Sequence, residues 1–187
     1  MLDSLRLPLR FDPQGLKSDL EKILPGEWVA HFNQSYYEGE WSGVALKSVG
    51  GVASQLYPDP TKQGTFADTE ILARCTYIQQ VLASFRCQTE AVRFLKLSAG
   101  SSIREHRDYK LGYEDGVVRV HIPVHTNADV QFFLDGKRLS MLEGECWYLN
   151  FNLPHRVENR SSQDRVHLVI DCVLNDWLDS LFGSAQS

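Results

Sequence analysis

The chain has 187 residues, of which 43% are hydrophobic and 23% charged, and its formal net charge is -5. This length is sufficient to bury one sizeable core, so we expect a single domain over residues 1–187. The acidic balance, without a block of Lys and Arg, argues against nucleic acid as a partner. The sequence contains neither an apolar run of bilayer length nor the pattern of a signal peptide, so we expect a cytoplasmic protein with no membrane partner.

The four cysteines are widely spaced and form no C-x-x-C pair, which argues against a zinc site and against a disulfide framework. We expect reduced thiols that pack as small hydrophobic side chains. These residues are Cys75, Cys87, Cys146 and Cys172.

Residues 1–90 are expected to form a helix-rich portion that packs on the rest of the chain and caps it. Asp12 followed by Pro13 predicts the start of a helix whose apolar positions continue to Leu24. A second apolar pattern with helical spacing covers residues 72–85. Between the helices two short strands are expected, EWVAHF and SGVALKSV.

From residue 91 to residue 174 the sequence changes to short β segments separated by turn residues, a spacing typical of two packed antiparallel sheets. Asp135-Gly136 between alternating segments predicts a tight hairpin. We therefore expect a mainly β fold with flanking helices, a double-stranded β-helix (jelly roll) of the cupin type, with NDWLDSLF closing the chain as a short helix. The expected strands are AVRFLKL, the stretch around REHRD, VVRVHIPV, DVQFFL, KRLSML, CWYLNF, HRVEN and RVHLVIDCV.

An imidazole and a carboxylate stand two positions apart in the segment His106-Arg107-Asp108. Because side chains two apart share a strand face, His106 and Asp108 can bind one metal ion while Arg107 points away. His155 follows several strands later, and a neighbouring strand can bring it to the same place. Two histidines and one carboxylate are the ligand set of non-heme Fe(II) oxygenases. The sequence therefore predicts a catalytic iron site with these three ligands.

Arg165 lies ten positions beyond His155 and begins the strand RVHLVIDC. Both faces of this strand are largely apolar, so the guanidinium is expected to be buried. A buried cation needs a carboxylate, which either the protein or a ligand can supply. A dicarboxylate cosubstrate would satisfy it, because the guanidinium fork matches the geometry of a carboxylate.

In VVRVHIPV, Arg119 and His121 fall on one strand face and apolar residues on the other. Two interpretations remain open for this pair: contacts to a ligand, or a polar network with acidic residues of the same sheet. His31 and His125 lie in less regular segments, and we expect them to be solvated or hydrogen-bonded histidines rather than metal ligands.

Taken together, these motifs resemble the aspartyl/asparaginyl β-hydroxylase family of Fe(II)/2-oxoglutarate-dependent oxygenases. The similarity runs through RFLKLSAGSSIREHRD, VVRVHIPV, GECWYLNFNLPHRVENRSSQDR and VHLVID, roughly residues 92–172. The combined order of H-x-D, R-x-H and then H followed by R ten residues later is more specific than any single motif. Asp108 departs from the animal aspartyl hydroxylases, which lack a carboxylate at this position.

The resemblance implies His106 and His155 as iron ligands, Arg165 as the main anchor of 2-oxoglutarate, and Arg119 with His121 as further contacts to this cosubstrate. It also implies a dioxygenase that uses Fe(II), 2-oxoglutarate and O2 to hydroxylate an amino acid, either free or within a peptide, with release of succinate and CO2. Two alternatives remain: a cupin-like metalloprotein with other chemistry, and a non-catalytic jelly roll that binds a small acid or a protein.

Overall fold

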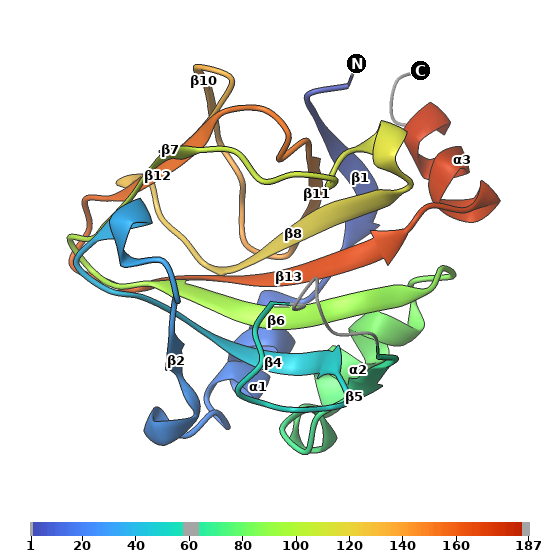
Figure 1. Cartoon of the computed structure of the whole chain (residues 1–187), viewed down its shortest axis with the longest axis horizontal. Helices are drawn as coiled ribbons and strands as arrows, with labels where there is room; N and C mark the ends of the chain where they lie inside the picture. The colour runs from blue at the N-terminus through green and yellow to red at the C-terminus, as the bar shows by residue number, and fades with distance from the viewer. Residues whose placement is uncertain (1, 58–63, 185–187) are drawn as a thin grey trace.

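The computed structural model describes residues 2–57 and 64–184. Two antiparallel sheets lie against each other, and two helices, α1 and α2, lie beyond strands β4 and β6 on the side away from the smaller sheet (Figure 1). The larger sheet has the strand order β1-β11-β8-β13-β6-β4-β2, with β5 paired to β4. Its strands are β1 (Ser4–Arg10), β2 (Val29–Ala30), β4 (Trp41–Val49), β5 (Phe66–Asp68), β6 (Thr89–Leu97), β8 (Val117–His125), β11 (Glu145–Leu149) and β13 (Arg165–Val173).

The smaller sheet has the order β10-β9-β12-β7-β3. All eight segments expected to be strands after residue 90 are found in the two sheets, which confirms a mainly β fold of the jelly-roll type. The strands of the smaller sheet are β3 (Tyr37–Glu38), β7 (Ser102–His106), β9 (Val130–Leu134), β10 (Lys137–Leu139) and β12 (His155–Asn159).

The first helix begins where the sequence predicts and ends earlier. Asp12 caps α1 (Pro13–Leu20), because its carboxylate accepts hydrogen bonds from the backbone N–H groups of Gln14 and Gly15 at 3.2 and 3.0 Å. The helix stops at Leu20, and the side chain of Leu24 is 56% exposed. The apolar pattern therefore overestimates the length of this helix by about one turn.

The second expected helix is divided into two pieces. A 3₁₀ turn covers Leu72–Arg74, and α2 (Thr76–Ala83) follows after Cys75. The expected closing helix is present as α3 (Asp176–Ser184). Buried side chains of all three helices join one hydrophobic core with the larger sheet, including Leu16 and Ile78.

The expectation of a helix-rich portion over residues 1–90 differs from the structure. This part of the chain supplies β1 to β5, while α1 and α2 have only eight residues each. β1 was not expected as a strand, although SLRLPLR alternates apolar and polar residues. Its pairing with β11, for example Leu7 with Cys146, depends on a partner about 140 residues away, which the local pattern does not reveal.

Alternation along β8 and β13 gives the larger sheet two different faces. One face carries apolar residues that pack with the helices, whereas the other faces the smaller sheet and carries the polar residues of the candidate site. The apolar face is made of Val118, Val120, Ile122, Val124, Val166, Leu168, Ile170 and Cys172. A second hydrophobic core lies between the two sheets, with Leu97, Phe132 and Val157 among its members.

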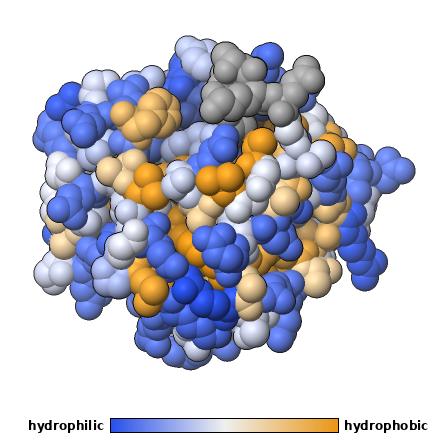
Figure 2. All heavy atoms as spheres, turned by 60° about the horizontal axis from the view of Figure 1, so that its bottom comes forward, coloured by the Kyte–Doolittle hydropathy of each residue, from blue (hydrophilic) through white to orange (hydrophobic). Residues whose placement is uncertain are grey.

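The face shown in Figure 2 is mostly hydrophilic, with hydrophobic residues confined to limited areas between charged side chains. Most large apolar residues of the described chain are buried in the two cores. Within residues 2–57 and 64–184, none of the helices has the length and apolar character needed to cross a membrane.

Candidate metal and cosubstrate site

The three predicted metal ligands meet where β7 and β12 pair. β7 ends at His106, β12 begins at His155, and these two residues are direct partners in the antiparallel register. Asp108 follows β7, and its backbone N–H donates to the carbonyl of Phe151 at 2.9 Å. The potential ligand atoms of His106, Asp108 and His155 all lie within 4.8 Å of one another. The expected convergence of these residues is found, and binding of iron by them stays a prediction.

Both histidines are oriented by hydrogen bonds to the backbone. Nδ1 of His106 lies 2.8 Å from the carbonyl oxygen of Arg104, and Nδ1 of His155 lies 3.0 Å from that of Leu153. Because a carbonyl can only accept, each Nδ1 carries a proton and each Nε2 is free to bind a metal. Burial, reinforced by the positive charge of a protonated His106, lowers the pKa of His155 to about 4, so this ring is neutral near pH 7.

The carboxylate of Asp108 is held by a buried ionic network, formed by Arg93, Asp171, Arg119 and Asp108. Arg119 donates from Nη1 to Asp108 at 2.7 Å, and from Nε and Nη2 to Asp171 at 2.7 and 3.0 Å. Asp171 also accepts from both terminal nitrogens of Arg93, at 3.2 Å each. Two guanidinium groups thus alternate with two carboxylates. The sequence left two interpretations open for Arg119, and this arrangement corresponds to the polar network with acidic residues of the same sheet.

Ion pairing offsets the cost of burial for Asp171 and Arg119. Burial alone would raise the pKa of Asp171, but the guanidinium groups of Arg119 and Arg93 hold it below its ordinary value. Burial alone would lower the pKa of Arg119, but the carboxylates of Asp171 and Asp108 raise it above the ordinary value. Arg119, itself held by Asp171, thus offers the Asp108 carboxylate a hydrogen bond on the side of the larger sheet.

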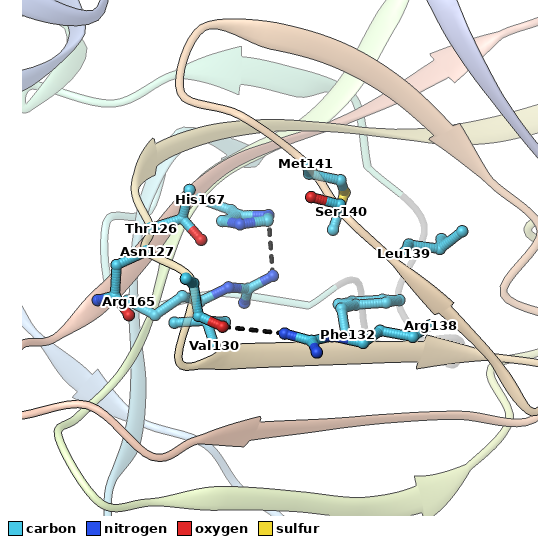
Figure 3. Close-up of a pocket in the computed structure, with 11 residues that line it drawn as sticks. Thr126, Asn127, Val130, Phe132, Arg138, Leu139, Ser140, Met141, Arg165 and His167 are labelled. Carbon is cyan, nitrogen blue, oxygen red and sulfur yellow. Dashed lines mark hydrogen bonds between the residues drawn. The ribbon is translucent and has the colours of Figure 1, made fainter.

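Arg165 differs from the other buried arginines because no described carboxylate forms an ion pair with it. Its side chain is only 3% exposed, and burial lowers its pKa to about 9. Nη2 bonds to Nδ1 of His167 at 2.8 Å (Figure 3), and Nε is buried without a hydrogen-bond partner among the described residues. Such a group is stabilised by an incoming anion, as the sequence suggested.

His121 and His167 complete the polar face between the sheets. Their Nδ1 atoms lie 3.2 Å apart, and Nε2 of His121 is buried without a partner in the part of the chain that the structure describes. Burial, and then the charge of Arg165, lowers the pKa of both rings well below the ordinary value. Both imidazoles are therefore neutral at pH 7 and can donate or accept a hydrogen bond.

Two cavities adjoin this polar face. A cavity of about 720 Å³ is lined by the three candidate metal ligands together with Arg119, His121 and Arg165. A smaller cavity of about 370 Å³ lies next to it between the β8–β9 loop and the connection from β10 to β11. Arg165 and Phe132 line the smaller cavity (Figure 3) and also the larger one, so Arg165 lies where the two cavities adjoin.

The residues present fit an iron ion and a dicarboxylate. Imidazole nitrogen and carboxylate oxygen suit Fe(II), and all three residues that would hold the ion line the larger cavity. At another point of the same cavity wall, Arg165 offers an anion a guanidinium that forms no ion pair with a described carboxylate.

Several residues of the larger cavity were not identified as functional by sequence reasoning. His31, expected to be a solvated or hydrogen-bonded histidine, accepts a hydrogen bond at Nδ1 from the backbone N–H of Asn33 at 3.2 Å. It also lines the cavity, is 6% exposed and stacks on Trp41 with ring centres 3.7 Å apart. Tyr36 stacks on His106 at 4.9 Å. The first contact joins the segment before β4 to β4 itself and the second joins it to β7, and no periodic pattern in the sequence indicates either contact.

Comparison with known proteins places these observations in a family. The family described as "Aspartyl/Asparaginyl beta-hydroxylase" matches residues 11–174. An L-proline cis-4-hydroxylase of Rhizobium meliloti (strain 1021) is 26% identical over 183 residues, which cover 95% of this chain and 63% of the relative. The chain therefore spans less than two thirds of the length of that relative.

The fold also matches a solved structure. A 2OG-Fe(II) oxygenase family oxidoreductase from Burkholderia pseudomallei superposes with a TM-score of 0.57 at 14% identity, over 91% of this chain and 85% of that chain. At this identity the likeness shows the jelly-roll fold alone. The family match covers most of the chain, including the candidate ligands and Arg165, and the chain belongs to the aspartyl/asparaginyl β-hydroxylase family.

Proposed function

We propose that the chain is an Fe(II)- and 2-oxoglutarate-dependent dioxygenase that hydroxylates an amino acid and releases succinate and CO2. One observation carries this proposal: Arg165, a buried guanidinium without a described carboxylate partner, lines the same cavity as His106, Asp108 and His155. One dicarboxylate molecule can then contact the metal through one end and Arg165 through the other.

Each residue of the site would have a distinct role. His106, Asp108 and His155 would hold iron, which when bound supplies the activation of O2 that hydroxylation requires. Arg165 would fix the far carboxylate of 2-oxoglutarate and so orient the cosubstrate. His121, whose Nε2 has no hydrogen-bond partner among the described residues, would be a further contact to the cosubstrate.

Arg119 would act mainly on the metal ligand. Its Nε, Nη1 and Nη2 are engaged by Asp171 and Asp108, so its guanidinium holds the Asp108 carboxylate in place. A contact from Arg119 to the cosubstrate is compatible with this position on the cavity wall and is part of the same proposal.

An amino acid is the proposed substrate class. The relative named as an L-proline cis-4-hydroxylase supports this choice and makes L-proline the first compound to test. A cavity of about 720 Å³ has room for a small molecule beside the cosubstrate.

An anaerobic titration tests the proposal. Metal-free protein is titrated with Fe(II) and then 2-oxoglutarate, and the visible charge-transfer band of the iron chelate is recorded. We expect a band in the parent protein, loss or alteration of the band in Asp108→Ala, and a requirement for about ten-fold or more 2-oxoglutarate in Arg165→Met. Arg86→Met changes an exposed arginine in the same way and should behave as the parent.

The outcomes separate the alternatives. Absence of both the band and Fe(II) binding in folded parent protein would reject the dioxygenase and favour a non-catalytic jelly roll. A band that forms equally well in Arg165→Met would show that the guanidinium does not anchor the cosubstrate. Metal binding without any response to 2-oxoglutarate would favour a cupin-like metalloprotein with other chemistry.

A further inference from the structure

Glu90 on β6 is an acidic residue of the larger cavity that takes no part in the ionic network of Arg93, Asp171, Arg119 and Asp108. It lines the cavity, it is half-buried, and no cation among the described residues forms an ion pair with it. Every other acidic side chain of this cavity, namely Asp108 and Asp171, is bound by arginine.

A bulge in β6 gives Glu90 this position. Ile170 pairs with Val92, whereas Cys172 pairs with Thr89, so β6 has one residue more than β13 between these pairs. A bulge changes the direction of side chains relative to a regular strand and is frequent beside functional sites. The irregular stretch lies opposite Asp171, and there Glu90 joins the lining of the cavity.

The surroundings of Glu90 disfavour the charged form of its carboxyl group. Burial and then the nearby charge of Asp171 raise its pKa above the ordinary value. A half-buried carboxylate without a counterion destabilises the protein, and a ligand that carries a positive charge would remove this cost. The cavity wall therefore favours a cationic group at this point.

Two further polar groups of the same cavity also have no partner. Nε1 of Trp41 and the hydroxyl of Tyr57 are buried and form no hydrogen bond with described residues, and Trp41 is only 8% exposed. The indole Nε1–H can only donate, and the phenol can donate. These groups require an acceptor, so the complete ligand would have both a cationic nitrogen and acceptor oxygens.

We propose that Glu90 binds the protonated amino group of the substrate and thereby selects free amino acids over residues within a peptide. The inference rests on the proposed function and names the substrate class of the same site. A peptide nitrogen carries no positive charge and would leave Glu90 unpaired. The carboxylate of a free amino acid supplies acceptors for the donors of Trp41 and Tyr57.

Calorimetry without oxygen tests the proposal on protein loaded with Mn(II) and 2-oxoglutarate. The probes are L-proline, a panel of other free amino acids, and the N-acetyl derivative of each. Glu90→Gln is compared with the parent and with Glu70→Gln, which removes an exposed carboxylate that does not line the cavity. The affinity for 2-oxoglutarate is measured for every variant, which tests the proposed function separately from the role of Glu90.

We expect Glu90→Gln to raise the Kd of the best free amino acid about ten-fold or more and to leave the affinity for 2-oxoglutarate and for N-acetyl derivatives unchanged. Glu70→Gln should match the parent. Because Glu90 has no described partner, its substitution should also preserve or raise the melting temperature, unlike that of a structural residue. Equal binding of free amino acids by the parent and Glu90→Gln, or binding of 2-oxoglutarate with no response to any free amino acid, would overturn the proposal. A parent that binds no 2-oxoglutarate would instead overturn the proposed function.

Discussion

At the scale of single residues, the metal ligands depend on contacts outside the ligand set. Asp108 is fixed by Arg119, and Arg119 is fixed in turn by Asp171 through two further hydrogen bonds. Groups that orient metal ligands commonly change metal affinity by about 10- to 100-fold when they are removed. The position of Arg119 therefore predicts an effect on iron binding without direct contact to the metal.

Arg119→Lys tests this arrangement. Lysine keeps the charge but cannot donate to Asp108 and Asp171 at the same time with the fork geometry of arginine. We expect the Kd for Fe(II), measured anaerobically, to rise about ten-fold. Arg107→Lys is the control, because Arg107 donates to the backbone carbonyl of Asn152 instead of to a metal ligand. Equal Fe(II) affinities for both variants would show that Arg119 does not position Asp108.

At the scale of elements, the β9–β10 hairpin is a feature that the sequence predicts well. Asp135 and Gly136 both have positive φ values, 47° and 74°, as a type I′ turn requires. Their strands pair in register from Lys137 with Leu134 onward. The turn brings β9 into position beside β12, which begins with His155.

Gly136→Ala should lower the free energy of unfolding by about 1 kcal/mol, because an alanine is strained at this φ. A Cβ at Gly136 would meet no atom within 4 Å, so the effect is that of the backbone alone. Gly26→Ala is a matched control, since Gly26 has equal free space without a positive φ. Urea denaturation measures both variants, and equal stabilities would contradict the left-handed conformation of the turn.

The elements that were predicted correctly share a strong local signal. Alternation along β8 and β13 and the turn residues between the later strands identify the sheets because each pattern is contained within a few residues. The C-terminal end of α1 and the pairing of β1 with β11 were not predicted, and the strand pairing depends on a distant partner. Tertiary packing, which a local pattern does not contain, decides such cases.

Across the whole molecule, the residues of the site also divide into those that a local sequence pattern predicts and those that depend on distant contacts. The positions of His106, Asp108, His155 and Arg165 could be predicted because their spacing follows strand geometry and the burial of one strand. The sequence did not predict that Asp171 binds Arg93 and Arg119, nor that His31 and Glu90 line the cavity. These features arise from contacts between separate strands and loops.

Burial of neutral histidines should make the stability of the metal-free protein depend on pH. Burial lowers the pKa of His31 to about 4 and lowers the pKa values of His121 and His167 well below the ordinary value. Between about pH 6.5 and pH 4 the unfolded chain therefore binds more protons than the folded protein, and acid favours unfolding. We expect the free energy of unfolding to fall by about 1 kcal/mol or more from pH 7 to pH 5.

Urea denaturation at these two pH values checks the expectation. His31→Phe preserves a ring beside Trp41 but removes one titrating group, so its stability should change less with pH than that of the parent. Identical unfolding free energies of the parent at pH 7 and pH 5 would show that the histidines are not buried in their neutral form.

The role of Arg165 as cosubstrate anchor is tested by a comparison of 2-oxoglutarate with 2-oxopentanoate, in which a methyl group replaces the far carboxylate. Their dissociation constants are determined without oxygen for Fe(II)-loaded parent protein and Arg165→Met. We predict that the parent prefers 2-oxoglutarate by about ten-fold or more and that Arg165→Met loses this preference, because the preference arises from the buried guanidinium. An equal preference in both proteins would contradict the assignment of Arg165 as the cosubstrate anchor.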